Sequence, residues 1–240
     1  MATGLHEDIV DALGGAIAAG RIPPGSVLTL AQLEAEHQAS RTVVREAVRV
    51  LESIGLVSSR RRVGITVQPR ERWDAFSPQL LAWNLQGPFR QQQLEALMEL
   101  RVAVEPMAAR LAAQRASAAE RAELTRLAEV LVGLGRRGLG TSEEFLDADV
   151  AFHALLLRAS GNPQIVALQT PVGALLRGRS RLGLHPVVPA PGTLEDHTRV
   201  AAAIRAGDAE EAEMLSRTHM RGVWHEVQGD GSLSSPADSA

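Results

Sequence analysis

The sequence lacks cysteine and lysine altogether, and aromatic residues make up only 3% of its 240 positions. Without cysteine, the chain has no disulfides, thiolate metal sites, iron–sulfur clusters or cysteine nucleophile. The scarcity of aromatic side chains argues against a surface that binds nucleic acid by stacking its bases. No apolar run approaches the roughly 20 residues that span a membrane, and acidic residues stand where a signal peptide is basic. We therefore expect a soluble, cytoplasmic protein.

All 25 cationic residues are arginines, and the formal net charge is −3. The arginines are unevenly distributed, because residues 40–72 hold eight of them against three glutamates. An acidic chain with one such basic segment is expected to bind a polyanion at one place, rather than along a uniformly basic surface.

The first 70 residues have the pattern of a winged helix-turn-helix domain. The expected elements are helices over 5–19, 30–37 and 40–53 and β-like runs over 56–59 and 65–67. Ser40 is a good N-cap for the third helix, and Gly55 is a good stop. The two β-like runs flank an arginine-rich turn, which predicts a hairpin. Three helices followed by a small hairpin predict a DNA-binding domain over residues 1–70.

The rest of the chain is expected to be helical, so the fold class is mainly α. A linker over 71–78 leads into a bundle of six or seven helices over 79–228, where capping boxes recur and no strand alternation appears. The candidate capping pairs are Ser117 with Glu120, Thr141 with Glu144, and Asp208 with Glu211. The last residues, 229–240, have the composition of a disordered tail.

Three arginines follow one another at intervals of four residues in the helix expected after Ser40. Arg41, Arg45 and Arg49 therefore share one face of that helix. Ser40 and Thr42 lie in its first turn, where backbone N–H groups and the helix dipole favour phosphate. Arginines on such a helix can each donate two hydrogen bonds to guanine in the major groove of DNA.

The expected hairpin adds Arg60–Arg62 and Gly64, which would bring cations and a closely approaching backbone to a phosphate or a neighbouring groove. Arg62 and Gly64 are the DNA-binding candidates among them. The alternative is a solvated arginine face in which Glu46 and Glu52 supply ion pairs. The order of helix, turn, helix and arginine-bearing hairpin favours binding to DNA.

The same segment resembles the winged-helix domain of the GntR family of bacterial transcription regulators over residues 5–67. The matching motifs are Gly20-x-Ile22-x-Pro24-Gly25-x-x-Leu28 and Ser40-Arg41-Thr42-x-Val44-Arg45-Glu46-Ala47-Val48, followed by Gly55-Leu56-Val57. The resemblance implies operator contacts at Ser40, Arg41, Thr42, Arg45 and Gly64. The chain departs from the family at Thr29-Leu30-Ala31, where Ser-Glu-Arg is common, which implies that the arginine contact made there is absent.

One acidic residue and three histidines are candidates for a metal site. Asp149 and His153 are four residues apart and share a face of one expected helix, while His197 and His219 lie in two further helices. The alternative is that these histidines are core or capping residues bonded to backbone carbonyls. No stronger zinc motif such as HExxH is present, so spacing alone leaves both interpretations open.

The helical part resembles the FCD effector domain of the fatty-acid-regulator-like branch of GntR proteins. The matching stretches include Leu97-Met98-Glu99-Leu100-Arg101, Asp149-x-x-Phe152-His153 and His197-x-x-x-x-Ala202. The resemblance implies an all-α bundle in which an aspartate and three histidines bind a divalent metal, with a carboxylate effector completing the coordination. The implied ligands are Asp149, His153, His197 and His219, a set that suits zinc, nickel, manganese or iron.

The resemblance also places Arg101 where it faces the effector, and a guanidinium can hold a carboxylate through two hydrogen bonds. A structural ion pair with Glu105 is the alternative. Asn162 and Arg177 are further effector-binding candidates, against a turn-shaping role for the first and a solvated face for the second. The Pro-x-x-Leu-x-Trp segment at Pro78 is similar to one in members that sense sugar acids or hydroxy acids.

We therefore expect a ligand-responsive transcription regulator, a repressor rather than an enzyme. A homodimer would place two arginine-bearing helices in successive major grooves of double-stranded operator DNA. A small carboxylate, such as a sugar acid or hydroxy acid, would control the affinity for the operator. One alternative is a regulator whose effector is the metal ion itself. A metal-dependent hydrolase is disfavoured, because four protein ligands leave little room for water and substrate.

Overall fold

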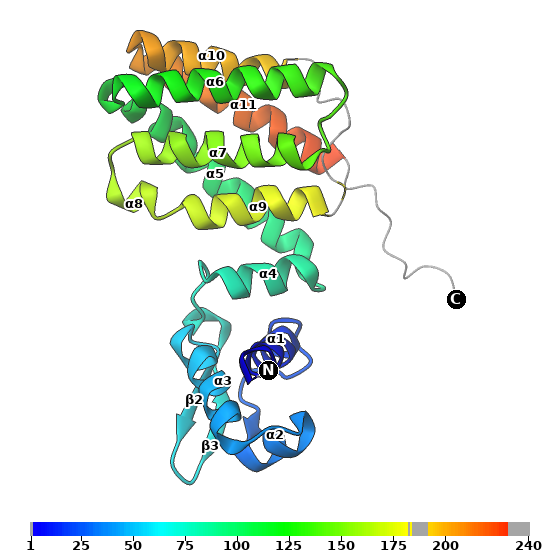
Figure 1. Ribbon diagram of the computed structural model, residues 1–240. Coiled ribbons are helices and arrows are strands. Elements are labelled where there is room, and N and C mark those ends of the chain that lie inside the picture. The colour runs from blue at the N-terminus through cyan, green and yellow to red at the C-terminus, as the bar shows by residue number, and fades with distance from the viewer. Residues whose placement is uncertain (1, 182, 184–191, 230–240) are drawn as a thin grey trace. The chain divides into compact units, whose positions relative to one another are not determined.

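The computed structural model describes residues 2–181, 183 and 192–229 (Figure 1). Its contacts divide the chain into two compact units, Met1–Gln93 and Leu94–Ala240. Of the disordered tail expected over 229–240, only Gly229 is described, as the last residue of a helix. The remainder of that tail lies outside the described residues.

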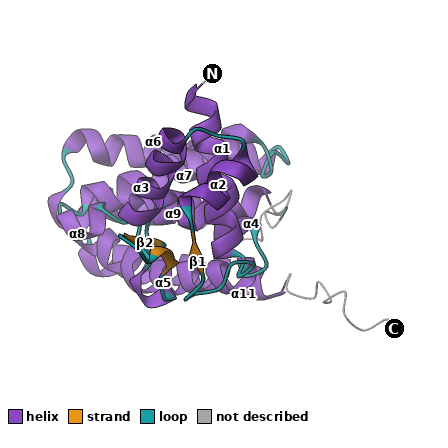
Figure 2. Cartoon of the chain, turned by 90° about the horizontal axis from the view of Figure 1, so that it is seen from below, coloured by secondary structure: helices purple, strands orange, loops and turns teal. Residues whose placement is uncertain are grey.

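The first unit contains the winged helix-turn-helix domain that the sequence predicts. Its elements are α1 (Ala2–Ala18), β1 (Val27–Leu28), α2 (Leu30–His37), α3 (Arg41–Ser53), β2 (Val57–Arg60) and β3 (Gly64–Val67). The strands form an antiparallel sheet in the order β1-β3-β2 (Figure 2). The predicted hairpin is β2–β3, whereas β1 is an addition that the sequence pattern does not indicate.

Local signals explain where α2 and α3 begin and end. Thr29 forms a capping box with Gln32, whose backbone N–H donates to the threonine hydroxyl at 3.2 Å. Ser40 caps α3 by accepting a backbone N–H three residues later at 3.4 Å. After α3, Gly55 has a φ of 76°, and a Cβ there would lie 2.2 Å from the carbonyl oxygen of Arg72. Only glycine fits that turn, so α3 ends where the sequence predicts.

The core of the first unit is aliphatic and explains which face of α3 remains outside. It is formed mainly by Ile9, Leu13 and Ile17 of α1, Val44, Val48 and Leu51 of α3, and Ile65 and Val67 of β3. The helical members recur every three or four residues, as an amphipathic helix requires. Burying that face of α3 leaves its arginine face toward solvent.

A short 3-10 turn, η1 (Arg70–Arg72), and helix α4 (Pro78–Gln86) complete the ordered elements before the longest helix. Helix α4 packs against α1, with Trp83 lying over Gly14 and its Nε1 donating to Asp11 Oδ1 at 3.0 Å. The sequence predicts a helical domain from residue 79 onward, whereas these contacts of α4 lie within the first unit.

The described part of the second unit consists of helices, as expected. They are α5 (Arg90–Arg115), α6 (Ala118–Arg136), α7 (Glu143–Ala159), α8 (Pro163–Val166), α9 (Gln169–Arg181), α10 (Thr193–Ala206) and α11 (Ala209–Gly229). Contacts join α9 to α7, α7 to α6, α6 to α10, and α10 to α11 (Figure 1). Apolar side chains such as Leu124, Leu131, Phe152 and Ile204 fill the space between them. None of the helices in the described residues has the combination of length and apolar character that crossing a membrane requires.

Candidate nucleic-acid interface and candidate metal centre

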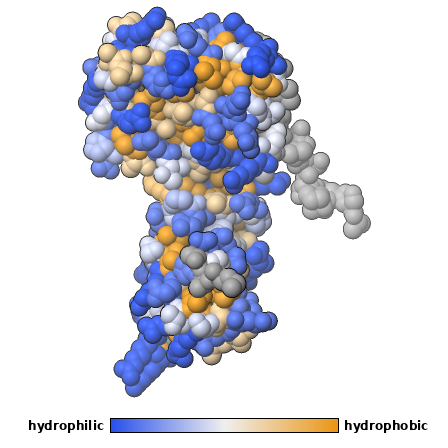
Figure 3. All heavy atoms as spheres, viewed as in Figure 1, coloured by the Kyte–Doolittle hydropathy of each residue, from blue (hydrophilic) through white to orange (hydrophobic). Residues whose placement is uncertain are grey.

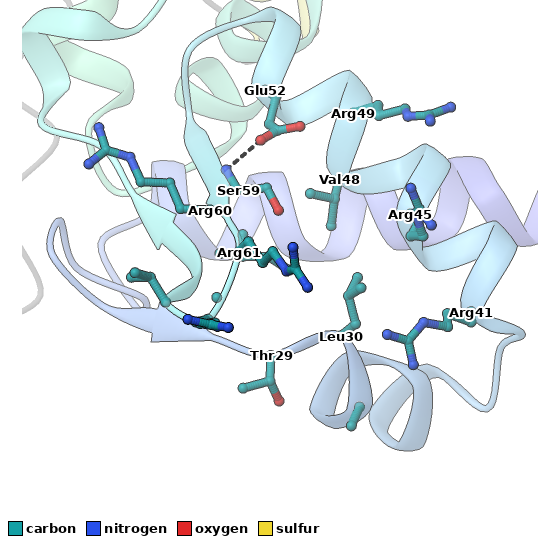
Figure 4. A pocket seen from close by; sticks show the side chains of 15 residues that line it. Thr29, Leu30, Arg41, Arg45, Val48, Arg49, Glu52, Ser59, Arg60 and Arg61 are labelled. Carbon is teal, nitrogen blue, oxygen red and sulfur yellow. Dashed lines mark hydrogen bonds between the residues drawn. The ribbon is translucent and has the colours of Figure 1, made fainter.

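An open groove of about 920 Å³ lies beside α3 in the first unit (Figure 4). Its lining includes Thr29, Leu30 and Ala31 at the start of α2, Arg41, Arg45 and Arg49 of α3, and Arg60, Arg61, Arg62 and Gly64 of the hairpin. Figure 4 shows Arg41 and Arg61 reaching into the groove from opposite sides. Figure 3 shows a hydrophilic surface over the tip of the hairpin. The structure thus brings together the arginines that the sequence predicts to face DNA.

The three arginines of α3 differ in their partners. Arg49 Nη1 lies 2.6 Å from Glu46 Oε1, as the alternative of an ion-paired face requires. Arg41 Nε lies 3.9 Å from a glutamate oxygen of α2, and its side chain is 68% exposed. Arg45 is exposed and pairs with no carboxylate in the part of the chain that the structure describes. An exposed cation without a partner can meet a phosphate or a base edge without first breaking an ion pair.

Glu52 is the second carboxylate that an ion-paired arginine face would use, but in the described residues it forms no ion pair with the arginines of α3. Its Oε1 accepts a hydrogen bond from the backbone N–H of Ser59 in β2 (Figure 4). This bond ties α3 to the hairpin and so fixes one wall of the groove. The same hairpin carries Arg60, Arg61 and Arg62, and all three line the groove.

The other predicted DNA-facing residues also have local roles. The hydroxyl of Ser40 caps α3, while Thr42 is exposed in the first turn. Arg62 has a positive φ of 66° in the turn of the hairpin. At Gly64, with a φ of 106°, a Cβ would lie 2.7 Å from the carbonyl oxygen of Leu28. Packing against β1 therefore accounts for the glycine by itself, and its contact with DNA stays a prediction.

The second unit brings the four predicted metal ligands together from three helices. Asp149 and His153 come from α7, His197 from α10 and His219 from α11, and each is 5% exposed or less. One ring nitrogen from each of the three histidines lies within 4.8 Å of the other two. Asp149 Oδ1 lies 3.4 Å from Nε2 of both His153 and His197. We call these four residues the histidine cluster.

A buried ion pair on α5 adjoins the histidine cluster. Arg101 Nε donates to Glu105 Oε1 at 2.5 Å, and the two side chains are 1% and 0% exposed. Glu105 Oε2 lies 2.7 Å from Nδ1 of His153, and Arg101 Nη2 donates to Nε2 of the same ring at 3.0 Å. Arg101 therefore forms the ion pair with Glu105 that was one expectation. It also reaches the histidine cluster, as the other expectation, a position facing the effector, requires.

The charges of these buried groups favour a cation. Burial opposes ionisation of Glu105, but Arg101 and His153 outweigh it and lower the pKa of the carboxyl to about 2. Burial is likewise outweighed at Asp149, whose pKa is held well below its usual range by hydrogen bonds and charge from His153 and His197. Metal binding requires the imidazoles in their neutral form, and in that form two carboxylates and one guanidinium leave one net negative charge, which a metal ion would compensate.

The histidines themselves differ in their electrostatic surroundings. Burial disfavours the charged ring of His153, yet the carboxylate of Glu105 outweighs it, so the pKa of His153 is raised. For His219, burial and the neighbouring positive charges of His197 and His153 hold the pKa well below its usual range. Nδ1 of His219 is buried without a hydrogen-bond partner among the described residues. A buried nitrogen in that state costs free energy unless a ligand engages it.

The two remaining effector candidates are not joined to the histidine cluster. Asn162 Oδ1 accepts the backbone N–H of Gln164 at 3.0 Å and caps α8, which is the turn-shaping role. Arg177 on α9 is 47% exposed, and its Nη1 lies 3.6 Å from Asp147 Oδ1. In the described residues, no hydrogen bond or ion pair connects either side chain with the cluster, so their roles in effector binding stay predictions.

Two family profiles match the chain, one in each unit. Residues 5–67 match the family described as "Bacterial regulatory proteins, gntR family", and residues 96–222 match the FCD domain. The groove lies within the first match, and the histidine cluster lies within the second.

Relatives that match most of the chain carry regulatory names. The "Galactonate operon transcriptional repressor" of Escherichia coli (strain K12) is 32% identical over 213 residues, which cover 88% of this chain and 91% of that protein. The "Putative L-lactate dehydrogenase operon regulatory protein" of the same organism is 31% identical over 202 residues, or 79% of this chain and 72% of that protein. The solved structure of "Streptococcus agalactiae GntR" has a TM-score of 0.51 at 23% identity, covers 91% of this chain and 98% of that chain, and supports the fold.

Proposed function

Because the chain belongs to the GntR family of bacterial regulatory proteins and carries an FCD domain, we propose that it is a repressor whose operator affinity is set by a small hydroxycarboxylate and a divalent metal ion. The observation that carries this proposal is the histidine cluster, in which three buried histidines and one buried aspartate, all of types that can bind a metal, converge from three helices. Family membership makes the chain a regulator rather than an enzyme, which removes the metal-dependent hydrolase from consideration.

Operator DNA is assigned to the groove of the first unit. In this proposal, exposed Arg45 and Arg41 on α3 would read guanine in a major groove, and Arg61 and Arg62 of the hairpin would meet phosphates or the adjacent groove. A homodimer would present two copies of α3 to half-sites about one helical turn of DNA apart. The homodimer and the surface through which its two subunits meet are both proposed.

The donor set of the histidine cluster fits a divalent transition metal. Three imidazoles and one carboxylate suit zinc, nickel, manganese or iron. Nδ1 of His219 makes no hydrogen bond in the described residues and lies 3.9 Å from Asp196 Oδ2. That nitrogen and the net negative charge of Asp149 and Glu105 against Arg101 agree with a cation there. When bound, the metal would supply positive charge and a coordination position for carboxylate and hydroxyl oxygens.

The effector is assigned to the class of sugar acids and hydroxy acids. Arg101 Nη2 lies 3.0 Å from Nε2 of His153, so a carboxylate that reaches the cluster would also meet a guanidinium. The names of two relatives refer to galactonate and to L-lactate dehydrogenase, and galactonate and lactate are both hydroxycarboxylates. Asn162 and Arg177 are secondary candidates for contacts with the rest of the effector.

A thermal-shift panel tests this function on protein whose metal content has been measured. Sugar acids, hydroxy acids, dicarboxylates and fatty acyl thioesters are each added to metal-loaded and metal-stripped protein. A ligand that binds the native state raises the melting temperature by mass action. We expect the rise with hydroxycarboxylates and only in metal-loaded protein, and we expect His197→Ala to abolish it. A metal-independent rise with an acyl thioester would overturn the assignment.

The burial of the cluster supports a second candidate, in which the metal ion itself is the effector. Its four side chains are 5% exposed or less, so a bare ion fits the site more readily than a ligand of several carbon atoms. Operator binding is measured by fluorescence anisotropy, on duplexes selected from random DNA, against free metal concentration without any carboxylate. Affinity that follows the metal alone would favour this candidate, whereas affinity that changes only when a hydroxycarboxylate is added would favour the first.

A further inference from the structure

Glu105 is a buried carboxylate outside the set of predicted metal ligands. It lies one helical turn after Arg101 on α5, is 0% exposed and receives Arg101 Nε on Oε1. Its other oxygen, Oε2, lies 2.7 Å from Nδ1 of His153, on a different helix. A buried carboxylate that only balanced Arg101 would not need this second contact.

Two charged neighbours determine which nitrogen of His153 carries its proton. A neutral imidazole has one N–H donor and one nitrogen with a free lone pair. Glu105 Oε2 lies 2.7 Å from Nδ1 without the geometry of a hydrogen bond, and Arg101 Nη2, which can only donate, lies 3.0 Å from Nε2, so the hydrogen is on Nδ1 and the lone pair is on Nε2. Nε2 lies 3.4 Å from Asp149 Oδ1, on the side of the histidine cluster, and its lone pair accepts from Arg101 Nη2 at 3.0 Å. That guanidinium bond opens when Nε2 binds a metal ion. Carboxylates in this position fix the ring orientation and the tautomer of metal-binding histidines.

We infer that Glu105 is a positioning residue of the histidine cluster, which holds His153 as the Nδ1–H tautomer with Nε2 directed at the cluster. Arg101 in turn holds Glu105 through its opposite oxygen. The inference rests on the proposed metal site. It gives the Arg101–Glu105 pair a second role. The pair orients His153 as a metal ligand, in addition to balancing charge on α5.

The first test measures the tautomer and needs no metal. Long-range ¹H–¹⁵N spectra of metal-stripped, histidine-labelled protein are recorded at pH 8, with the His153 signals assigned from their absence in His153→Gln. We expect the Nδ1–H form of His153 in the unmodified chain and a mixture of both tautomers in Glu105→Gln, since an amide can donate as well as accept. A dominant Nε2–H form in the unmodified chain would overturn the inference.

The second test measures metal affinity by competition with a chromophoric chelator, using Co²⁺ and Zn²⁺. Loss of an outer carboxylate typically weakens metal binding by 10- to 100-fold, so we expect about that loss in Glu105→Gln. Glu123→Gln is the matched control, because it removes the carboxylate of an exposed Arg–Glu pair on α6. It should leave the affinity and the Co²⁺ absorption spectrum unchanged.

A double variant separates positioning from charge balance and from misfolding. Arg101→Gln with Glu105→Gln removes both charges, so that no unpaired ion stays buried. We expect the metal affinity of this variant to stay low and its Co²⁺ spectrum to stay altered. Recovery of normal affinity and spectrum would mean that Glu105 only neutralises Arg101, which overturns the inference. If the unmodified chain and His197→Ala bind metal equally or not at all, the proposed metal site is wrong. The positioning role of Glu105 is then wrong as well.

Discussion

At the scale of single residues, the three arginines of α3 differ in their carboxylate partners, although their spacing in the sequence makes them equivalent. Arg41, Arg45 and Arg49 recur every four residues, yet Arg49 is held by Glu46 at 2.6 Å while Arg45 has no carboxylate partner in the described part of the chain. An exposed ion pair is worth about 0–1 kcal/mol, so DNA can displace Glu46 at a small cost. Arg45 has no ion pair to break, so we expect it to contribute more than Arg49 to affinity for DNA.

Arg45→Ala should therefore weaken specific operator binding by roughly 1–3 kcal/mol, and Arg49→Ala should weaken it less. Fluorescence anisotropy with a selected operator duplex at fixed salt measures both. Arg126→Ala is the matched control, because it removes an exposed arginine that pairs with Glu123 on α6. Equal losses in Arg45→Ala and Arg126→Ala would show that the effect is a general change of charge.

The candidate metal ligands could be predicted from the sequence, but Glu105 could not be placed with them. Four-residue spacing puts Asp149 and His153 on one helix face, and the resemblance to the FCD domain adds His197 and His219. Arg101 and Glu105 are also four residues apart, and this spacing predicts only an ion pair within one helix. That Glu105 reaches His153 depends on the packing of α5 against α7, which no local pattern encodes.

At the scale of elements, capping signals predict helix starts well and sometimes miss by one position. Ser117 and Glu120 form the predicted capping box of α6, and Asp208 accepts the backbone N–H of Glu211 as expected. For α7, however, the cap is Ser142 rather than Thr141, with its hydroxyl accepting the Phe145 N–H at 3.1 Å. Adjacent hydroxyl residues offer the same chemistry, so only the folded chain decides between them.

The capping box of α6 gives a pH-dependent prediction. Hydrogen bonds from the backbone N–H and the hydroxyl of Ser117 lower the pKa of Glu120 below 4.5. A carboxyl whose folded pKa is lowered stabilises the native state above its unfolded pKa, and that stabilisation is lost as pH falls through the folded pKa. Glu120→Gln should cost less than about 1 kcal/mol at pH 7 and should flatten the decline of stability below pH 4.5.

Urea unfolding at a series of pH values between 7 and 3 measures this effect. Glu129→Gln is the control, because Glu129 is an exposed carboxylate on the same helix that makes no hydrogen bond in the described residues. A decline in Glu120→Gln as steep as that of the unmodified chain would contradict the prediction.

Two elements of the first unit could not be placed from sequence because their partners are distant. Strand β1 has two residues, too few to show alternation, and it exists through pairing with β3 almost forty positions later. Helix α4 falls almost entirely within the region expected to be helical, but its packing on α1 depends on Gly14, and a glycine inside a helix normally lowers helix stability. In both cases, non-local contacts decide where the element lies.

Gly14 and Gly15 provide a matched pair that tests the docking of α4. A Cβ at Gly14 would lie 2.2 Å from Cη2 of Trp83, whereas one at Gly15 would lie 3.9 Å from Cδ1 of the same ring. Gly14→Ala should displace the indole and destabilise the first unit by roughly 1–3 kcal/mol. Gly15→Ala should be neutral or stabilise it by up to about 1 kcal/mol, because alanine favours helix.

Chemical unfolding followed by tryptophan fluorescence compares the two variants. Loss of the Trp83 Nε1 bond to Asp11 should also shift the native emission of Gly14→Ala alone. Equal stabilities of the two variants would mean that Trp83 does not lie over Gly14 in solution.

For the whole molecule, the division of the chain into two compact units implies that DNA binding and effector binding can be removed separately. Arg45→Ala should lose operator affinity and retain the thermal shift with metal and hydroxycarboxylate. His197→Ala should lose that thermal shift and retain affinity for the operator in the absence of effector. Loss of both properties in either variant would point to misfolding or to one shared site.

The same two measurements set a quantitative condition on the proposed repressor. If a hydroxycarboxylate weakens operator binding by some factor, saturating operator must weaken binding of that hydroxycarboxylate by the same factor, because coupling between two sites is reciprocal. Such couplings typically amount to 5- to 150-fold, within reach of calorimetry on free and DNA-saturated protein. We expect equal factors in the unmodified chain and a factor near one in His197→Ala. Complete exclusion of hydroxycarboxylate from DNA-saturated protein, in place of a finite factor, would mean that ligand and operator compete for the DNA-facing groove. The arginines of α3 rather than the histidine cluster would then be the site of the hydroxycarboxylate.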